Sequence, residues 1–109
     1  HGGSGTTAAS LRSGIPTIVT PIAVDQFHWA NIVNTKGWGV GTEDLTKISR
    51  ADLVRAMREC EKPELIERVR KNGEQLRSED GPSEAVKVIQ MYLDILRDPE
   101  KAAEAAKRA

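Results

Sequence analysis

The sequence predicts an α/β fold in which a short parallel sheet is followed by several helices. Two short apolar or β-branched segments, residues 17–20 and 38–41, alternate with helical stretches, as parallel strands joined by helices do. The rest of the chain shows helical periodicity only. Because two parallel strands alone would leave both sheet edges open and bury little surface, we expect the chain to be part of a larger domain.

Residues 1–41 are expected to contain both strands and two helices. The predicted elements are helix 6–13, strand 17–20, helix 26–36 and strand 38–41. Gly14 and Gly37 mark the ends of the two helices, because glycine readily adopts the left-handed backbone that commonly follows a helix. Asp25 directly precedes the second helix and is a residue type typical of an N-cap.

The segment after residue 41 is expected to be helical. Ser49 and Asp52 form an S-x-x-D capping signature, and Pro63 suits the first position of the next helix. Apolar side chains recur at helical spacing at Leu53, Met57, Cys60, Leu65, Val69, Leu76, Val86, Ile89, Leu93 and Leu96.

Two interruptions divide this helical segment. Gly73 weakens the middle of its helix by about 1 kcal/mol relative to alanine. Asp98-Pro99 ends the last apolar stripe. The alanine-rich residues that follow are expected to form either an exposed helix or a fraying end.

Composition excludes several classes of protein. Sixteen basic residues balance sixteen acidic ones, so no net charge draws nucleic acid or an anionic membrane. Cys60 is the only cysteine, which rules out an internal disulfide and fits a reducing compartment. No apolar run approaches the roughly 20 residues of a membrane span, and no metal-ligand spacing occurs.

The run His-Gly-Gly-Ser-Gly-Thr-Thr at residues 1–7, together with Asp25 and Gln26, is the candidate functional motif. A glycine-rich loop that enters a helix presents backbone N–H groups at the positive end of the helix dipole, where phosphate binds. A carboxylate beside an amide suits the hydroxyls of a sugar, because the carboxylate accepts hydrogen bonds and the amide both accepts and donates them. The combination predicts one site with a phosphate at one end and a polar ring at the other.

The same residues carry a family resemblance. Residues 1–21, Asp25-Gln26 and the Gly-Trp-Gly-Val-Gly run at 37–41 resemble the C-terminal, nucleotide-sugar-binding half of glycosyltransferases with the GT-B fold. Within that group the chain is most similar to the sterol 3-β-glucosyltransferases and the bacterial antibiotic glycosyltransferases. The resemblance implies a Rossmann-like parallel-sheet domain, with residues 1–97 as part of the donor-binding domain and residues 98–109 as an alanine-rich helical or frayed tail.

The resemblance also implies a role for each matching residue. Those expected to contact the donor diphosphate are His1, Ser4, Gly5 and Thr6. Those expected to hydrogen-bond the sugar, which is usually glucose in this group, are Asp25 and Gln26. Donors aimed at the diphosphate would stabilise the negative charge that grows as the glycosidic bond breaks. No metal and no cofactor are expected; a UDP-sugar is the donor substrate.

The implied function is inverting transfer of a sugar, glucose by expectation, from a UDP-sugar to a lipophilic acceptor such as a sterol. The catalytic base is expected in an N-terminal acceptor domain, in the same chain or in a separate one, and is therefore unassigned. Two alternatives stay open: a non-catalytic donor-half subunit that needs an acceptor-domain partner, and an interaction module with a vestigial loop. We expect a cytoplasmic protein, with a position at the periphery of a membrane as the alternative.

The motif residues also have simpler structural interpretations. Residues 1–5 are typical of a tag and linker as well, although the resemblance continues without a break beyond them. Ser4 and Thr6 are also candidate helix caps, which is compatible with phosphate binding because both use the same N–H groups. Asp25 has the alternative of being an N-cap alone. Packing or surface roles are expected for His28, Trp29, Trp38 and Cys60.

Overall fold

The computed structural model describes residues 1–108 of the chain. These residues form two compact units, one spanning His1–Ser78 and the other beginning at Glu79. The first unit contains α1 (Ser4–Ser13), β1 (Thr17–Val19), α2 (Gln26–Lys36), β2 (Gly39–Gly41), α3 (Arg50–Cys60) and α4 (Pro63–Ser78). The second contains α5 (Gly81–Arg97) and α6 (Pro99–Arg108). The predicted α/β class is confirmed: the described chain is mostly helical, with one short parallel sheet.

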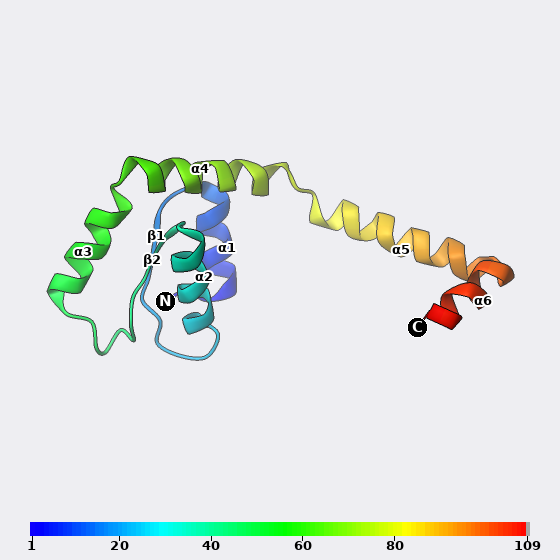
Figure 1. The fold of residues 1–109 in the computed structure, drawn as a ribbon, viewed down its shortest axis with the longest axis horizontal. Helices are drawn as coiled ribbons and strands as arrows, with labels where there is room; N and C mark the ends of the chain where they lie inside the picture. The colour runs from blue at the N-terminus through cyan, green and yellow to red at the C-terminus, as the bar shows by residue number, and fades with distance from the viewer. Residues whose placement is uncertain (109) are drawn as a thin grey trace. The chain divides into compact units, whose positions relative to one another are not determined.

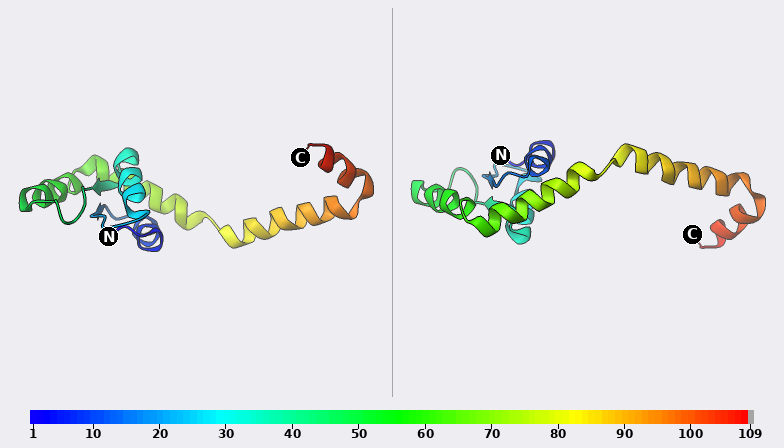
Figure 2. Two further views of the ribbon diagram at one scale, coloured as in Figure 1. Left: turned by 90° about the horizontal axis from the view of Figure 1, so that it is seen from below. Right: turned by 90° about the horizontal axis from the view of Figure 1, so that it is seen from above.

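The strands β1 and β2 pair in parallel, with Thr17 opposite Gly39 and Val19 opposite Gly41. Helix α2 makes the crossover between them, and Figures 1 and 2 show α3 on the other side of the strand pair from α2. Val19, Ala30 and Val33 form the buried cluster that holds α2 on the sheet. A Cβ atom at Gly39 would collide with the Thr17 backbone, so the strands approach this closely only because glycine occupies the position.

Helix α4 packs along α1 and closes the first unit. Gly73 lies against Gly14, and a Cβ atom on Gly73 would lie 2.6 Å from the Gly14 Cα atom. The sequence identified Gly73 as a weak point of its helix, and this close approach is the reason that the position needs glycine.

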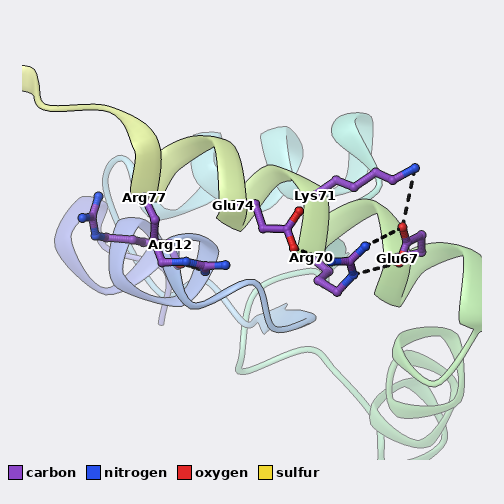
Figure 3. Close-up of polar contacts among 6 residues, drawn as sticks. All are labelled: Arg12, Glu67, Arg70, Lys71, Glu74 and Arg77. Carbon is purple, nitrogen blue, oxygen red and sulfur yellow. Dashed lines mark hydrogen bonds and ion pairs between the residues drawn. The ribbon is translucent and has the colours of Figure 1, made fainter.

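Reciprocal arginine contacts join the same two helices. The Arg77 guanidinium donates to the Arg12 carbonyl oxygen at 2.5 Å, and the Arg12 guanidinium donates to the Leu76 carbonyl oxygen at 2.8 Å. Figure 3 shows the two arginines together where α1 and α4 meet. Each helix therefore receives a cation at its C-terminal carbonyl groups, where the helix dipole is negative.

The solvent-facing side of α4 carries ion pairs between Arg70 and both Glu67 and Glu74, and between Lys71 and Glu67 (Figure 3). These side chains are about half exposed or more. Exposed ion pairs contribute little, typically about 0–1 kcal/mol each. Packing against α1, rather than this charge network, therefore fixes the position of α4.

Several predicted boundaries are confirmed and others shift by one or two residues. Ser49 and Asp52 form the predicted capping box, and α4 begins at Pro63 as expected. The first helix begins at Ser4 rather than at residue 6, because Gly3, in an extended conformation, is the N-cap. The strands are each one residue shorter than predicted, β1 ending at Val19 and β2 beginning at Gly39.

The second unit is built from α5 and α6. The Asp80 carboxylate caps α5 by accepting from the Ser83 backbone N–H at 3.2 Å. None of the α5 residues is buried, and the exposed large apolar side chains on it are Val86, Val88, Ile89, Met91, Tyr92, Leu93 and Leu96. The predicted break at Asp98-Pro99 is present, and the alanine-rich tail is helical from Pro99 to Arg108. Ala109 lies outside the described residues.

The division between the two units falls after Ser78, whereas the sequence placed the end of the donor-binding domain at residue 97. The physical reason is that α5 contributes no buried side chain, so the buried core of the first unit contains no residue of α5. The role assigned to residues 1–97 stays a prediction. Among residues 1–108, no helix combines the length and the apolar character needed to cross a membrane.

Candidate functional site

The N-terminus of α1 is the first part of the candidate site. The first helical hydrogen bond runs from the Thr7 N–H to the Gly3 carbonyl oxygen, at 2.9 Å. The preceding amides, those of Ser4, Gly5 and Thr6, therefore have no acceptor within the helix. A Cβ atom added at Gly5 would meet nothing within 4 Å, so the space over this end of the helix is open. The residues expected to bind diphosphate thus present free donors to an open space.

Gly2 fixes this loop to the sheet. It is buried, has a φ of +83°, and a Cβ atom there would collide with the side chain of Val19. Any larger residue would be strained at this φ and would push the loop away from the carboxyl end of β1. Glycine therefore holds the α1 N-terminus beside the segment that follows β1.

His1 lies between the two parts of the motif. Its Nδ1 atom accepts from the Gly3 N–H at 3.1 Å and lies 3.3 Å from the Gln26 side-chain nitrogen. Because both neighbours are donors, Nδ1 acts as the acceptor and the proton of the neutral ring lies on Nε2. The His1 Nε2–H group is then available as a further donor at the site.

Gln26 joins the two predicted motifs, whose contacting residues are 25 positions apart in the sequence. Its Oε1 atom accepts from the backbone N–H groups of Ile22 and Ala23, at 2.8 and 2.9 Å. Its amide nitrogen faces His1. Gln26 therefore braces the segment that follows β1 and fixes its distance from the glycine-rich loop. The sequence assigned this residue to the sugar and missed its bracing contacts, for which the sequence contains no signal.

Asp25 occupies the N-cap position of α2, as predicted, but its side chain makes no capping hydrogen bond. Its backbone φ and ψ are −73° and −10°, and its Oδ2 atom instead accepts from the indole N–H of Trp29 at 3.1 Å. The sequence assigned Trp29 to packing. The spacing of four residues along a helix is the signal that predicts such a contact.

Val24, immediately before Asp25, has a φ of +55° and is 89% exposed. A left-handed backbone is unfavourable for a β-branched side chain, and burial does not compensate for it here. The strain lies directly beside the candidate sugar-binding carboxylate.

Replacing Val24 with glycine is expected to stabilise the intact protein by about 1 kcal/mol. The left-handed conformation costs a residue with a Cβ atom about 1–2 kcal/mol, and the larger unfolded-state entropy of glycine offsets part of the gain. Thermal denaturation measures the change. Val24→Ala keeps a Cβ atom and is the matched control, with a change in stability within about 0.5 kcal/mol expected. Destabilisation by Val24→Gly would contradict this account of the turn.

A pocket of about 420 Å³ opens beside β2 and α3, away from these residues; Val40, Ile48 and Ala56 are among its apolar lining. Two of its acidic residues, Asp52 and Glu59, pair with Arg55 and Lys62. None of the predicted site residues lines this pocket.

Cys60 is half-buried at the end of α3. Burial and the nearby Glu59 carboxylate raise the pKa of its thiol, which disfavours the reactive thiolate form. A raised thiol pKa is consistent with the packing role predicted for Cys60. Across residues 1–108, no group of three or more histidine, cysteine or acidic side chains gathers to hold a metal ion.

Comparison with known proteins shows the family to which the chain belongs. Residues 1–71, which include both parts of the motif, match the model of the UDP-glucoronosyl and UDP-glucosyl transferase family. The chain is 39% identical to the sterol 3-beta-glucosyltransferase of Komagataella phaffii over 94% of its own length. It is 41% identical to those of Kluyveromyces lactis and Yarrowia lipolytica over 89% of its length. The aligned segment covers 8%, 8% and 6% of these relatives, so the chain spans less than a tenth of each.

Proposed function

Because the chain belongs to the UDP-glucoronosyl and UDP-glucosyl transferase family, we propose that its first unit is the donor-binding part of a glycosyltransferase. The reaction is transfer of a sugar, glucose in this proposal, from a UDP-sugar to a lipophilic acceptor such as a sterol. The observation that carries the proposal is the contact of His1 with Gln26. This contact joins the N-terminus of α1, where backbone amides are free, to the segment that holds the exposed Asp25 carboxylate. The family and the relatives support the same assignment.

The diphosphate lies, in this proposal, at the N-terminus of α1. The amides of Ser4, Gly5 and Thr6 donate to its oxygens, and the His1 Nε2–H group donates from the side. These groups are fixed before the substrate arrives, so they stabilise the charge that develops on the leaving UDP without reorganisation. They neutralise the diphosphate without a metal ion or a cofactor.

The sugar lies beside Asp25. One carboxylate oxygen is held by Trp29, and the other accepts from sugar hydroxyls. Gln26 keeps one side-chain N–H free beyond its contact with His1, and that group donates to the same ring. The acceptor hydroxyl attacks the anomeric carbon as the bond from that carbon to the UDP oxygen breaks, which inverts the configuration. The base that takes the hydroxyl proton belongs to an acceptor domain, in the same chain or in a partner.

The decisive test adds a negative charge to the open space at the α1 N-terminus. Gly5→Asp in the intact protein is expected to weaken UDP binding at least about tenfold, measured by calorimetry, because the new carboxylate faces the diphosphate. The same substitution favours the helix, since an acidic residue in the first turn interacts well with the dipole. Gly5→Asn, which has the same shape without the charge, is the matched control. Equal UDP affinity for the two variants would overturn the proposed diphosphate site.

A further inference from the structure

We propose that Trp29 is a positioning residue, which orients the Asp25 carboxylate for the donor sugar and thereby contributes to sugar selectivity. This inference rests on the proposed function, because it assigns a role at the same site. Trp29 is half-buried in the first turns of α2. Its indole N–H donates to Asp25 Oδ2 at 3.1 Å, and its backbone N–H donates to the Asp25 carbonyl oxygen, also at 3.1 Å. One residue thus fixes both the backbone and the side chain of Asp25.

The indole is the single donor that the structure gives to this carboxylate within the described residues. The Asp25 side chain does not cap α2, and no ion pair within residues 1–108 includes it. A terminal carboxylate torsion is broad, so without a partner the group would sample many orientations. The Trp29 contact selects one orientation and leaves Oδ1 free to accept.

The chemistry of the indole gives this contact a fixed direction. The indole nitrogen donates and cannot accept, so Asp25 must be the acceptor in this contact. The His28 ring lies edge-on to Trp29, with 5.6 Å between ring centroids and an interplanar angle of 68°, and this contact supports the indole from the side. A carboxylate oriented in this way recognises a ring that places a hydroxyl group at one fixed position. Two hexoses that differ in the configuration of one hydroxyl group are then distinguished.

Trp29→Phe in the intact protein tests the proposal, because it removes the N–H group and keeps an aromatic ring. We expect the ratio of kcat/KM for UDP-glucose to that for UDP-galactose to fall about tenfold. The inhibition constant of UDP, which lacks the sugar, is expected to stay unchanged. Trp38→Phe is the matched control and should alter neither quantity, because within residues 1–108 the hydrogen bond to the Asp25 carboxylate comes from Trp29. An unchanged sugar ratio in Trp29→Phe would overturn the positioning role.

Two further variants separate positioning from a merely structural effect. Trp29→His retains a ring N–H donor and is expected to preserve more of the sugar selectivity than Trp29→Phe; equal selectivity in the two variants contradicts the proposal. In an Asp25→Ala background Trp29→Phe should cause no further loss of sugar selectivity, since the carboxylate that Trp29 orients is already absent. Additive losses would overturn the proposal. A wild-type protein that neither binds UDP nor uses UDP-glucose would refute the proposed function itself, whereas an active protein with unaltered Trp29→Phe kinetics refutes only the role of Trp29.

Discussion

Asp25→Ala is expected to lower kcat/KM for UDP-glucose about 100-fold in the intact protein. A hydrogen bond to a charged group contributes about 1.5–3 kcal/mol, and at the upper end of that range its loss corresponds to two orders of magnitude. In the proposed site the Asp25 carboxylate contacts the sugar and not the UDP part of the donor. The inhibition constant of UDP is therefore expected to remain within about twofold of the wild-type value. Steady-state kinetics with UDP-glucose, together with inhibition by UDP, measure both quantities.

The loss should arise from recognition rather than from unfolding. Because the Asp25 side chain makes no capping hydrogen bond, its removal costs α2 only the exposed contact with Trp29. The melting temperature of Asp25→Ala is therefore expected to stay close to that of the wild type. Asp94→Ala removes an exposed carboxylate from α5 and serves as the control, with wild-type kinetics expected. Transfer at the wild-type rate by Asp25→Ala would exclude Asp25 from sugar binding.

Gly73→Ala is expected to destabilise the first unit by about 2 kcal/mol. A methyl group there would lie 2.6 Å from Gly14 Cα and 2.7 Å from Gly14 N, and both atoms belong to the backbone. A backbone neighbour cannot rotate away as a side chain can, so α1 and α4 must separate, at a cost of about 1–3 kcal/mol for overpacking. Alanine contributes up to about 1 kcal/mol of helix propensity, which offsets only part of that cost.

Denaturation of the intact protein, with hydrogen exchange of the α1 and α4 amides, measures this effect. Faster exchange in both helices is expected, because their separation also breaks the reciprocal contacts of Arg12 and Arg77. Gly5→Ala is the matched control for stability: it adds the same methyl group within a helix of the same unit, where no atom lies within 4 Å. If Gly73→Ala stabilised the protein as an ordinary helical glycine-to-alanine change does, the close packing of α4 on α1 would be wrong.

Local sequence signals predicted the features of the fold that depend only on neighbouring residues. Glycine ends α1 and α2, the capping box begins α3, and proline begins α4, and each of these effects acts within one turn. The strands were also predicted, since a β-branched run such as residues 17–20 has few alternatives.

Contacts between distant segments could not be predicted in the same way. The contact of Gln26 with His1 joins residues 25 positions apart, and no local signal in the sequence indicates it. The approach of Gly73 to Gly14 depends in turn on where α4 crosses α1. For the candidate site, the sequence supplied the candidate residues, whose functional roles stay predictions, whereas the contacts that Gln26 and Asp25 make required the structure.

The pairing of α1 with α4 also sets an order for folding. Arg12 bonds to Leu76 across 64 positions of sequence, whereas the β1–α2–β2 segment closes on itself through much shorter loops. Shorter loops lose less entropy on closure and form earlier, so the strands and α2 are expected to assemble before α1 is locked. During synthesis, the glycine-rich loop at residues 1–5 is then expected to become fixed only after α4 has left the ribosome and packed on α1. The end of the site that we propose to bind phosphate is thus synthesised before Asp25 and Gln26 and is expected to become rigid after them.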